Sequence, residues 1–105
     1  MDFQVFISND ALSDLEWIVA YVAPHNARAA ERLGNQLLDA AWSLRTPPER
    51  GRTVPEIRRP EFREIIFRSY RIIYRLNQAD QSLEIVRFWH GARGFPHIPG
   101  EGHHV

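Results

Sequence analysis

The feature that most constrains this chain is a change in its hydrophobic period at Pro47-Pro48. From Ala11 to Leu44, apolar residues recur every three or four positions, which is the spacing of one helical face. After it come short runs rich in β-branched and aromatic residues, which are typical of strands. The pattern therefore predicts helices first and a sheet afterwards, as in an α+β domain.

The residues before Pro47 predict one short strand and two helices. Phe3, Val5 and Ile7 alternate with polar residues, as in a strand. Ser8 or Asn9 can then cap a helix, and the break at 24–26 separates that helix from a second one. Two apolar stripes follow from this reading, formed by Ala11, Leu15, Ile18, Val19 and Val22 and by Ala30, Leu33, Leu37, Ala41 and Leu44.

The residues after Pro48 predict a connecting loop, three strands and a tail. The proline- and arginine-rich segment 46–61 is expected to be an ordered loop, and the strands are expected at 62–68, 70–76 and 83–90. The order is then β-α-α-β-β-β. We expect a helical hairpin packed on one face of a small, mostly antiparallel sheet whose other face is partly open. Residues 1–93 form a single domain in this reading, and residues 94–105 form an irregular tail.

Alternation along residues 70–76 assigns side chains to the two faces of the sheet. Tyr70, Ile72, Tyr74 and Leu76 share one face, which is predicted to be the core face. Arg71, Ile73 and Arg75 then lie on the open face, where the arginines can meet phosphates or acidic side chains. The alternative is that they are solvated charges that protect an open sheet from aggregation.

Length and composition limit the classes of protein to which this chain can belong. The chain has 105 residues, which is room for one domain, and it has no cysteine. It shows neither an apolar run of membrane-spanning length nor a signal peptide, so we expect a cytoplasmic protein. No metal site or cofactor is predicted.

Charge is distributed unevenly along the chain. All 13 basic residues are arginine, and the net charge is zero. Residues 1–44 carry two arginines and six acidic residues, whereas residues 45–105 carry 11 arginines and seven acidic residues. This asymmetry favours one face suited to an acidic partner, although a dipolar surface without a specific partner would look the same.

Several short strings, taken in order, carry a resemblance to a known family. Ser8, Ala11, Asp14 and Leu15 form a Ser-x-x-Ala-x-x-Asp-Leu run after the first strand. Later strings are Arg63-Glu64-Ile65, Tyr70-Arg71-Ile72-Ile73-Tyr74-Arg75 and His90-Gly91-Ala92-Arg93. With this element order, residues 3–93 resemble the ParE/RelE superfamily of bacterial type II toxins.

The resemblance implies two alternative activities. RelE-like members are ribosome-dependent mRNA endonucleases, and the positions that match their basic residues are Arg71 and Arg93. The strand that would add further basic residues has Arg63 followed by Ile65 and Phe67, and the tail after Arg93 has no tyrosine. The nuclease set is therefore incomplete in this chain. In this alternative the catalytic residues would be Arg71, His90 and Arg93, with the ribosome and mRNA as partners.

The strings are more similar to the ParE-like branch, whose members poison DNA gyrase and need no nucleolytic centre. That resemblance implies a plasmid-stabilization type of toxin that is not itself an enzyme, and it implies a hetero-oligomer with a cognate antitoxin. The residues expected to bind the target or the antitoxin are Arg63, Arg71, Arg75 and Arg93.

His90 and the large aromatic residues have both a functional and a structural reading. A histidine can act as a general acid or base near neutral pH, but His90 at a strand end is also placed to bond a backbone group. Trp17, Trp42, Phe88 and Trp89 can stack on bases, yet aromatic residues on amphipathic elements are usually core. We expect most of them in the core.

Overall fold

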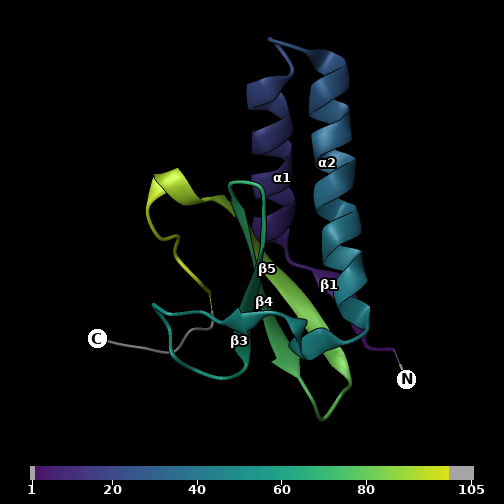
Figure 1. Cartoon of the computed structure of the whole chain (residues 1–105), viewed down its shortest axis with the longest axis vertical. Helices are drawn as coiled ribbons and strands as arrows, with labels where there is room; N and C mark the ends of the chain where they lie inside the picture. Colours follow the sequence, from purple (N-terminus) through teal and green to yellow (C-terminus); the bar gives the residue numbers. More distant parts are fainter. Residues whose placement is uncertain (1, 100–105) are drawn as a thin grey trace.

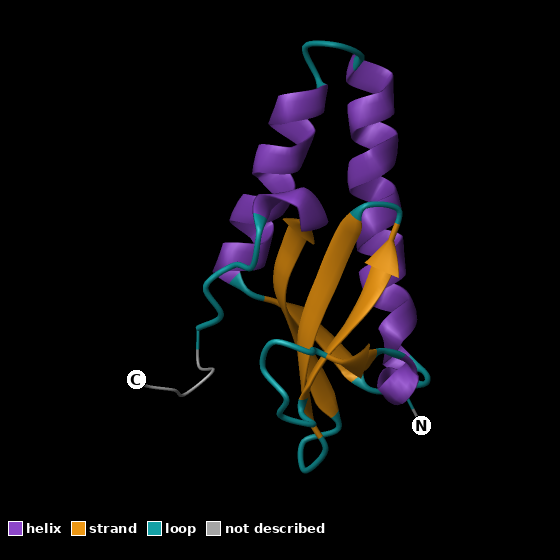
Figure 2. Cartoon of the chain, turned by 60° about the vertical axis from the view of Figure 1, so that its left-hand side comes forward, coloured by secondary structure: helices purple, strands orange, loops and turns teal. Residues whose placement is uncertain are grey.

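The computed structural model describes residues 2–99 and has the predicted α+β architecture (Figure 1). A helical hairpin lies along one five-stranded sheet, and its far half projects beyond the strands (Figure 2). The elements are β1 (Gln4–Ile7), α1 (Asn9–Val22), α2 (Ala27–Trp42), β2 (Arg52–Thr53), β3 (Phe62–Phe67), β4 (Tyr70–Asn77) and β5 (Ser82–His90), with the short 3₁₀ helices η1 (Ser43–Arg45), η2 (Pro48–Arg50) and η3 (Gly91–Arg93).

Both helices begin at the predicted caps. The Ser8 hydroxyl accepts a hydrogen bond from the Ala11 amide at 3.0 Å, and it donates to the Val86 carbonyl at 3.3 Å. The Asn26 side chain accepts from the Ala29 amide at 3.0 Å. Each cap satisfies a backbone donor that the first helical turn leaves unpaired. The Ser8 contact also ties the start of α1 to the sheet.

The sheet has the strand order β1-β5-β4-β3-β2. β1 pairs with β5 in parallel, and the other pairs are antiparallel. The turn between β3 and β4 is as tight as predicted, and Arg68 adopts a positive φ of 54° within it. A register irregularity after Ile73 places Val86 as an extra residue on β5, so that the strand bends there.

The helix-covered face of the sheet carries the main core, as predicted. Leu37 and Leu44 from the hairpin side are fully buried against a set from the sheet that includes Ile72, Tyr74 and Ile85. Gly34 lets the helices approach closely, because a Cβ there would lie 3.0 Å from the Val19 side chain. The predicted core assignment of residues 70–76 is confirmed for Ile72, Tyr74 and Leu76, and Tyr70 packs at the margin of the same core.

The prediction of a partly open second face needs correction. Ile73 is fully buried there in a separate cluster with Val54, Phe62, Val86 and Ile98. The cover consists of the loop before β3, which crosses the strands in Figure 2, and of the described part of the tail. Segment 46–61 also contains η2 and the short strand β2. We call this side the loop-covered face. Irregular segments leave no hydrophobic period, so the sequence pattern did not indicate this second core.

The tail prediction concerns residues 94–105, of which 100–105 lie outside the described residues. Residues 94–99 have no helix or strand, yet Ile98 is buried. Within residues 2–99, no helix is both long and apolar enough to cross a membrane.

Candidate functional site

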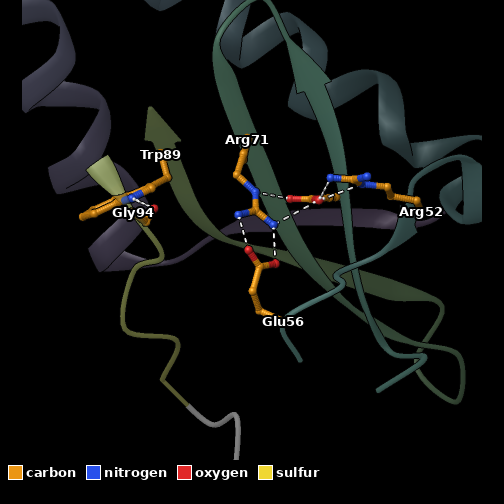
Figure 3. Close-up of polar contacts among 6 residues, drawn as sticks. Arg52, Glu56, Arg71, Trp89 and Gly94 are labelled. Carbon is orange, nitrogen blue, oxygen red and sulfur yellow. Dashed lines mark hydrogen bonds and ion pairs between the residues drawn. The ribbon is translucent and has the colours of Figure 1, made fainter. Parts of the chain in front are cut away.

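An arginine–carboxylate cluster, formed by Arg52, Glu56, Glu64 and Arg71, lies on the loop-covered face (Figure 3). Arg71 Nε donates to Glu64 Oε1 at 2.6 Å, and its two terminal nitrogens donate to the Glu56 carboxylate at 2.9 and 2.7 Å. Arg52 Nε donates to the other Glu64 oxygen at 2.8 Å. One arginine of β4 thus joins the carboxylate of a neighbouring strand to the carboxylate of the covering loop.

The burial of the Glu64 side chain explains why its carboxylate is paired with two arginines. The Glu64 side chain has no exposed surface, and a buried carboxylate is stable only when it is paired and hydrogen-bonded. The hydrogen bonds of Arg71 to Glu56 and Glu64 outweigh its desolvation and raise the pKa of the guanidinium. The same contact with Arg71 lowers the pKa of Glu56. Arg71 is therefore a neutralised, largely buried cation, not a free one.

The other two predicted binding residues of the sheet occupy different positions. Arg63 pairs with Tyr74 in the β3–β4 register, which places it on the helix-covered side, and it donates to the Gly51 carbonyl at 2.8 Å. Arg75 lies on the loop-covered face and meets Glu84 at 3.5 Å, with both side chains about two-fifths exposed. Arg63 thus holds the loop, and Arg75 stays close to solvent.

A second ion pair joins α1 to β5. Arg87 donates from Nε and Nη2 to the two Asp14 oxygens at 2.7 and 2.6 Å, and Asp14 also accepts the Phe88 amide at 3.1 Å. The bond to Asp14 raises the pKa of Arg87. This bidentate contact fixes the helical hairpin relative to the last strand.

Aromatic and arginine side chains form a stack beside this ion pair. The Arg93 guanidinium lies 4.4 Å from the ring centroid of Trp17 and 3.9 Å from that of Trp89. Arg87 lies 4.6 Å from the Trp89 ring, and Trp17 stacks on Tyr21 at 5.3 Å. Trp89 also donates its indole N–H to the Gly94 carbonyl at 2.9 Å (Figure 3). These contacts place the Arg93 guanidinium over two indole rings.

A cavity of about 240 Å³ opens next to the stack. We call it the Trp17–Arg93 cavity; it is lined by Trp17, Ile18, Tyr21, Tyr70, His90 and Arg93. His90 packs edge-on against Tyr70 at 5.1 Å, and its Nδ1 accepts the Ala92 amide at 3.1 Å. Burial raises the pKa of Tyr70. His90 Nδ1 thus makes a hydrogen bond to backbone at the end of the strand, as the structural interpretation of this residue predicted.

The structure separates the three residues that the nuclease alternative requires. Arg71 pairs with Trp89 across the β4–β5 ladder, whereas His90 pairs with Tyr70, so successive residues place Arg71 and His90 on opposite faces. Glu64 is bound to Arg52 and Arg71 and does not contact His90. Only His90 and Arg93 line the same cavity.

Sequence reasoning missed two buried acids and misplaced two tryptophans. Glu64 and Asp14 are 1% and 6% exposed. Each is an acidic residue within a largely apolar strand or helical stripe, and that position was the indication of burial that the sequence offered. Most of the four aromatic residues were expected in the core. Phe88 is buried there, whereas Trp17 and Trp42 are 48% and 55% exposed, so the expectation is wrong for these two. Both lie outside the apolar stripes of their helices, which was the sign that they face solvent.

Comparisons with known proteins agree with this architecture. The model of the family described as the ParE toxin of the type II toxin–antitoxin system parDE matches residues 5–95. A relative from Caulobacter vibrioides named Toxin RelE1 is 37% identical over 95 residues, which cover 87% of this chain and 96% of the relative. The protein is thus a toxin of type II toxin–antitoxin systems within the ParE/RelE superfamily. It belongs to the ParE toxin family, as the sequence resemblance predicted.

Two solved structures share the fold. One is described as a chromosomal ParDE toxin–antitoxin system from P. aeruginosa, with a TM-score of 0.70 and 14% identity over 84% of this chain and 95% of that chain. The other is the toxin–antitoxin complex RelBE2 from Mycobacterium tuberculosis, with a TM-score of 0.67 and 19% identity over 86% of this chain and 99% of that chain. At these identities the likeness concerns the fold alone.

Proposed function

We propose that this toxin acts by binding and inhibiting DNA gyrase, and that a cognate antitoxin neutralises it. The observation that best supports a binding mechanism is the position of Arg71. It is 13% exposed, it is neutralised by Glu56 and Glu64, and it lies on the face opposite His90. The match to the ParE family supports the choice of gyrase as target.

The two mechanisms place different demands on geometry. Cleavage of RNA requires a proton acceptor and a charge-stabilising group that both reach the reacting atoms. Inhibition by binding requires only a few exposed anchor residues on a stable scaffold. Arg93, Trp17 and Tyr21 are such exposed residues, and they lie together.

The proposed antitoxin partner follows from the same family. Both solved structures that share the fold are described as toxin–antitoxin systems or complexes. We expect a small reading frame next to this gene whose product forms a stable hetero-oligomer with the toxin. Co-expression and size-exclusion chromatography test this expectation, and a toxin that elutes alone beside the product of that frame would contradict it.

A second candidate function is RelE-like cleavage of mRNA on the ribosome. His90, Tyr70 and Arg93 line one cavity, which brings a histidine, a tyrosine and a cation together. In this alternative the cavity would be the catalytic centre, and Arg71 would stabilise the fold without taking part in catalysis.

Two assays on one preparation separate the candidates. We expect inhibition of gyrase supercoiling and no cleavage of mRNA on translating ribosomes. His90→Ala should leave growth inhibition largely intact, because binding needs no proton transfer, and the exposed His25→Ala is the matched control. Circular dichroism and protein levels establish that both variants are folded. Loss of both toxicity and mRNA cleavage in folded His90→Ala, with His25→Ala still active, would establish the nuclease instead.

A further inference from the structure

Arg93 differs from the arginines that are buried beside it. Arg71 and Arg87 are 13% and 14% exposed and bind carboxylates, whereas Arg93 is exposed and has no ion pair among the described residues. The buried acid of α1, Asp14, is already occupied by Arg87 and the Phe88 amide. Arg93 is therefore a cation held in position by two indole rings, with its hydrogen-bonding edge still available.

The contacts and charge of Arg93 favour a carboxylate as its ligand. The ring centroids of Trp17 and Trp89 lie 4.4 and 3.9 Å from its guanidinium carbon, so two indole rings hold the side chain in place. An arginine binds a carboxylate through its N–H groups in a charge-assisted, often bidentate contact. Because the two rings already hold the side chain, binding would not cost the usual loss of its rotamer freedom.

The other lining residues add a histidine, two tyrosines and apolar walls. Because His90 Nδ1 accepts the Ala92 amide, the neutral imidazole carries its proton on Nε2 and can donate from there. Ile18, Trp17 and the ring of Tyr21 provide apolar surface around it. The cavity volume of about 240 Å³ is below the roughly 300–1,000 Å³ of small-molecule pockets, so it suits one side chain rather than a whole cofactor.

We propose that the Trp17–Arg93 cavity is an anchor site for a peptide segment of a partner protein, in which a carboxylate side chain adjoins a bulky apolar one. The carboxylate meets the edge of Arg93, and the apolar side chain fills the cavity against Trp17, Ile18 and Tyr21. The inference rests on the proposed function, in which the toxin acts through protein partners. A nucleic-acid backbone fits less well, because it requires a row of cations and the lining contains a single arginine.

The three tryptophans of the chain make a direct test possible. Trp17 and Trp89 contact Arg93, whereas Trp42 lies under Arg45 at 5.1 Å, away from the cavity lining. Their indole N–H signals in proton NMR spectra can be assigned with Trp→Phe variants. The signals of Trp17 and Trp89 then report on the cavity, and the signal of Trp42 is the internal control. The probes are the capped peptide Ser-Phe-Glu-Ser, its Ser-Phe-Gln-Ser counterpart and hexauridylate.

We expect the glutamate peptide to shift the signals of Trp17 and Trp89 and to leave that of Trp42 unchanged. It should bind about tenfold more tightly than the glutamine peptide, because only a carboxylate forms the charge-assisted pair. Arg93→Gln should remove that difference, and Arg45→Gln, which disrupts the matched arginine–tryptophan contact, should preserve it.

Three results would overturn the inference. They are equal affinity for both peptides, absence of any shift at millimolar peptide, and a response to hexauridylate alone, which would indicate a nucleic-acid site. If Arg93→Gln loses its dispersed spectrum, Tyr21→Ala replaces it, since Tyr21 is 66% exposed. That variant should weaken both peptides and keep their ratio. The titration contains neither gyrase nor antitoxin, so its failure and a failure of gyrase inhibition are independent results.

Discussion

The two faces of the sheet are covered in different ways. On the helix-covered face, regular helices pack apolar stripes against the strands, and residues such as Leu37 and Ile85 are fully buried. On the loop-covered face, a small apolar cluster around Ile73 and Phe62 lies beside the arginine–carboxylate cluster. The first face is held mainly by the periodic burial of apolar area, with the Asp14–Arg87 ion pair at its side, whereas the second combines a smaller apolar cluster with polar contacts between particular residues.

The difference follows from what covers each face. A helix satisfies its own backbone hydrogen bonds, so it can pack through apolar side chains alone. An irregular loop must have its backbone groups bound by other parts of the protein. Tyr74 does this for the start of the loop from the helix-covered side, because its hydroxyl donates to the Pro48 carbonyl at 2.6 Å and accepts from the Gly51 amide at 2.9 Å. On the loop-covered face, Arg71 and Glu56 join the loop to the sheet, so we expect this face to be the more sensitive one to changes in charge.

The largest effect is expected on the helix-covered face. Leu37→Ala removes a side chain with no exposed surface and should lower the free energy of unfolding by about 3–5 kcal/mol. Leu12→Ala, on an exposed position of α1, is the control and should change it by less than about 0.5 kcal/mol. Urea unfolding measures both. Similar stabilities for the two variants would show that the hairpin does not pack as described.

The second effect tests the arginine–carboxylate cluster. Glu64→Gln leaves Arg71 and Arg52 with a neutral partner, and it should lower the free energy of unfolding by about 2–3 kcal/mol. The double variant Glu64→Leu/Arg71→Leu removes charge from both sides, and it should recover most of that loss, because an apolar pair can replace a buried ion pair. Urea unfolding of the two variants gives the comparison. A double variant that is less stable than Glu64→Gln would show that the ion pair itself stabilises this face.

The sequence predicted the helix-covered face far better than the other. Both helix caps, the element order apart from the short strand β2, and the core assignment of Ile72 and Tyr74 followed from period and local chemistry. These features depend on residues close together in sequence, or on repeated spacing. The family resemblance was also confirmed by the match over residues 5–95.

The candidate site was less predictable because its contacts are not local. Arg87 and Asp14 are 73 positions apart, and no spacing rule connects them. Arg71 was assigned to the correct face, but its two carboxylate partners arrive from β3 and from an irregular loop. Arg93 was named as a binding residue, whereas the aromatic residues that hold it were expected in the core. Which charges remain free is therefore decided by tertiary structure.

A third prediction concerns the tail as a cover of the loop-covered face. Ile98 is 1% exposed and packs in the cluster around Ile73. Ile98→Ala should lower the free energy of unfolding by about 2 kcal/mol, at the low end for such a change because a small cluster at a chain end can partly collapse. Val22→Ala, at the half-buried C-terminal end of α1, is the matched control on the other side and should cost less. Thermal melts of both variants measure this, and an unchanged melt for Ile98→Ala would mean that the tail does not cover the sheet.

The smallest expected effect isolates the outermost contact of the arginine–carboxylate cluster. The hydrogen bond from Arg71 lowers the pKa of Glu56 below its ordinary value of 4.5. A carboxylate with a depressed pKa in the folded state stabilises the protein above the pKa of the unfolded state, and this contribution is lost as the pH falls through the folded value. The Glu56 side chain is 43% exposed, so solvent screening keeps the contribution below about 1 kcal/mol.

Glu56→Gln should therefore be slightly less stable than wild type at pH 7, and the difference should vanish once acid protonates Glu56 in the wild-type protein. The exposed Glu31→Gln on α2 is the control, because it removes the same charge without touching Arg71. Thermal melts across a pH series at low ionic strength measure the difference, and added salt should shrink it because the pair is partly exposed. A Glu56→Gln deficit that persists unchanged at acid pH would assign Glu56 a packing role. The loop would then be held by Glu64, Tyr74 and its apolar residues alone, without help from charge at its surface.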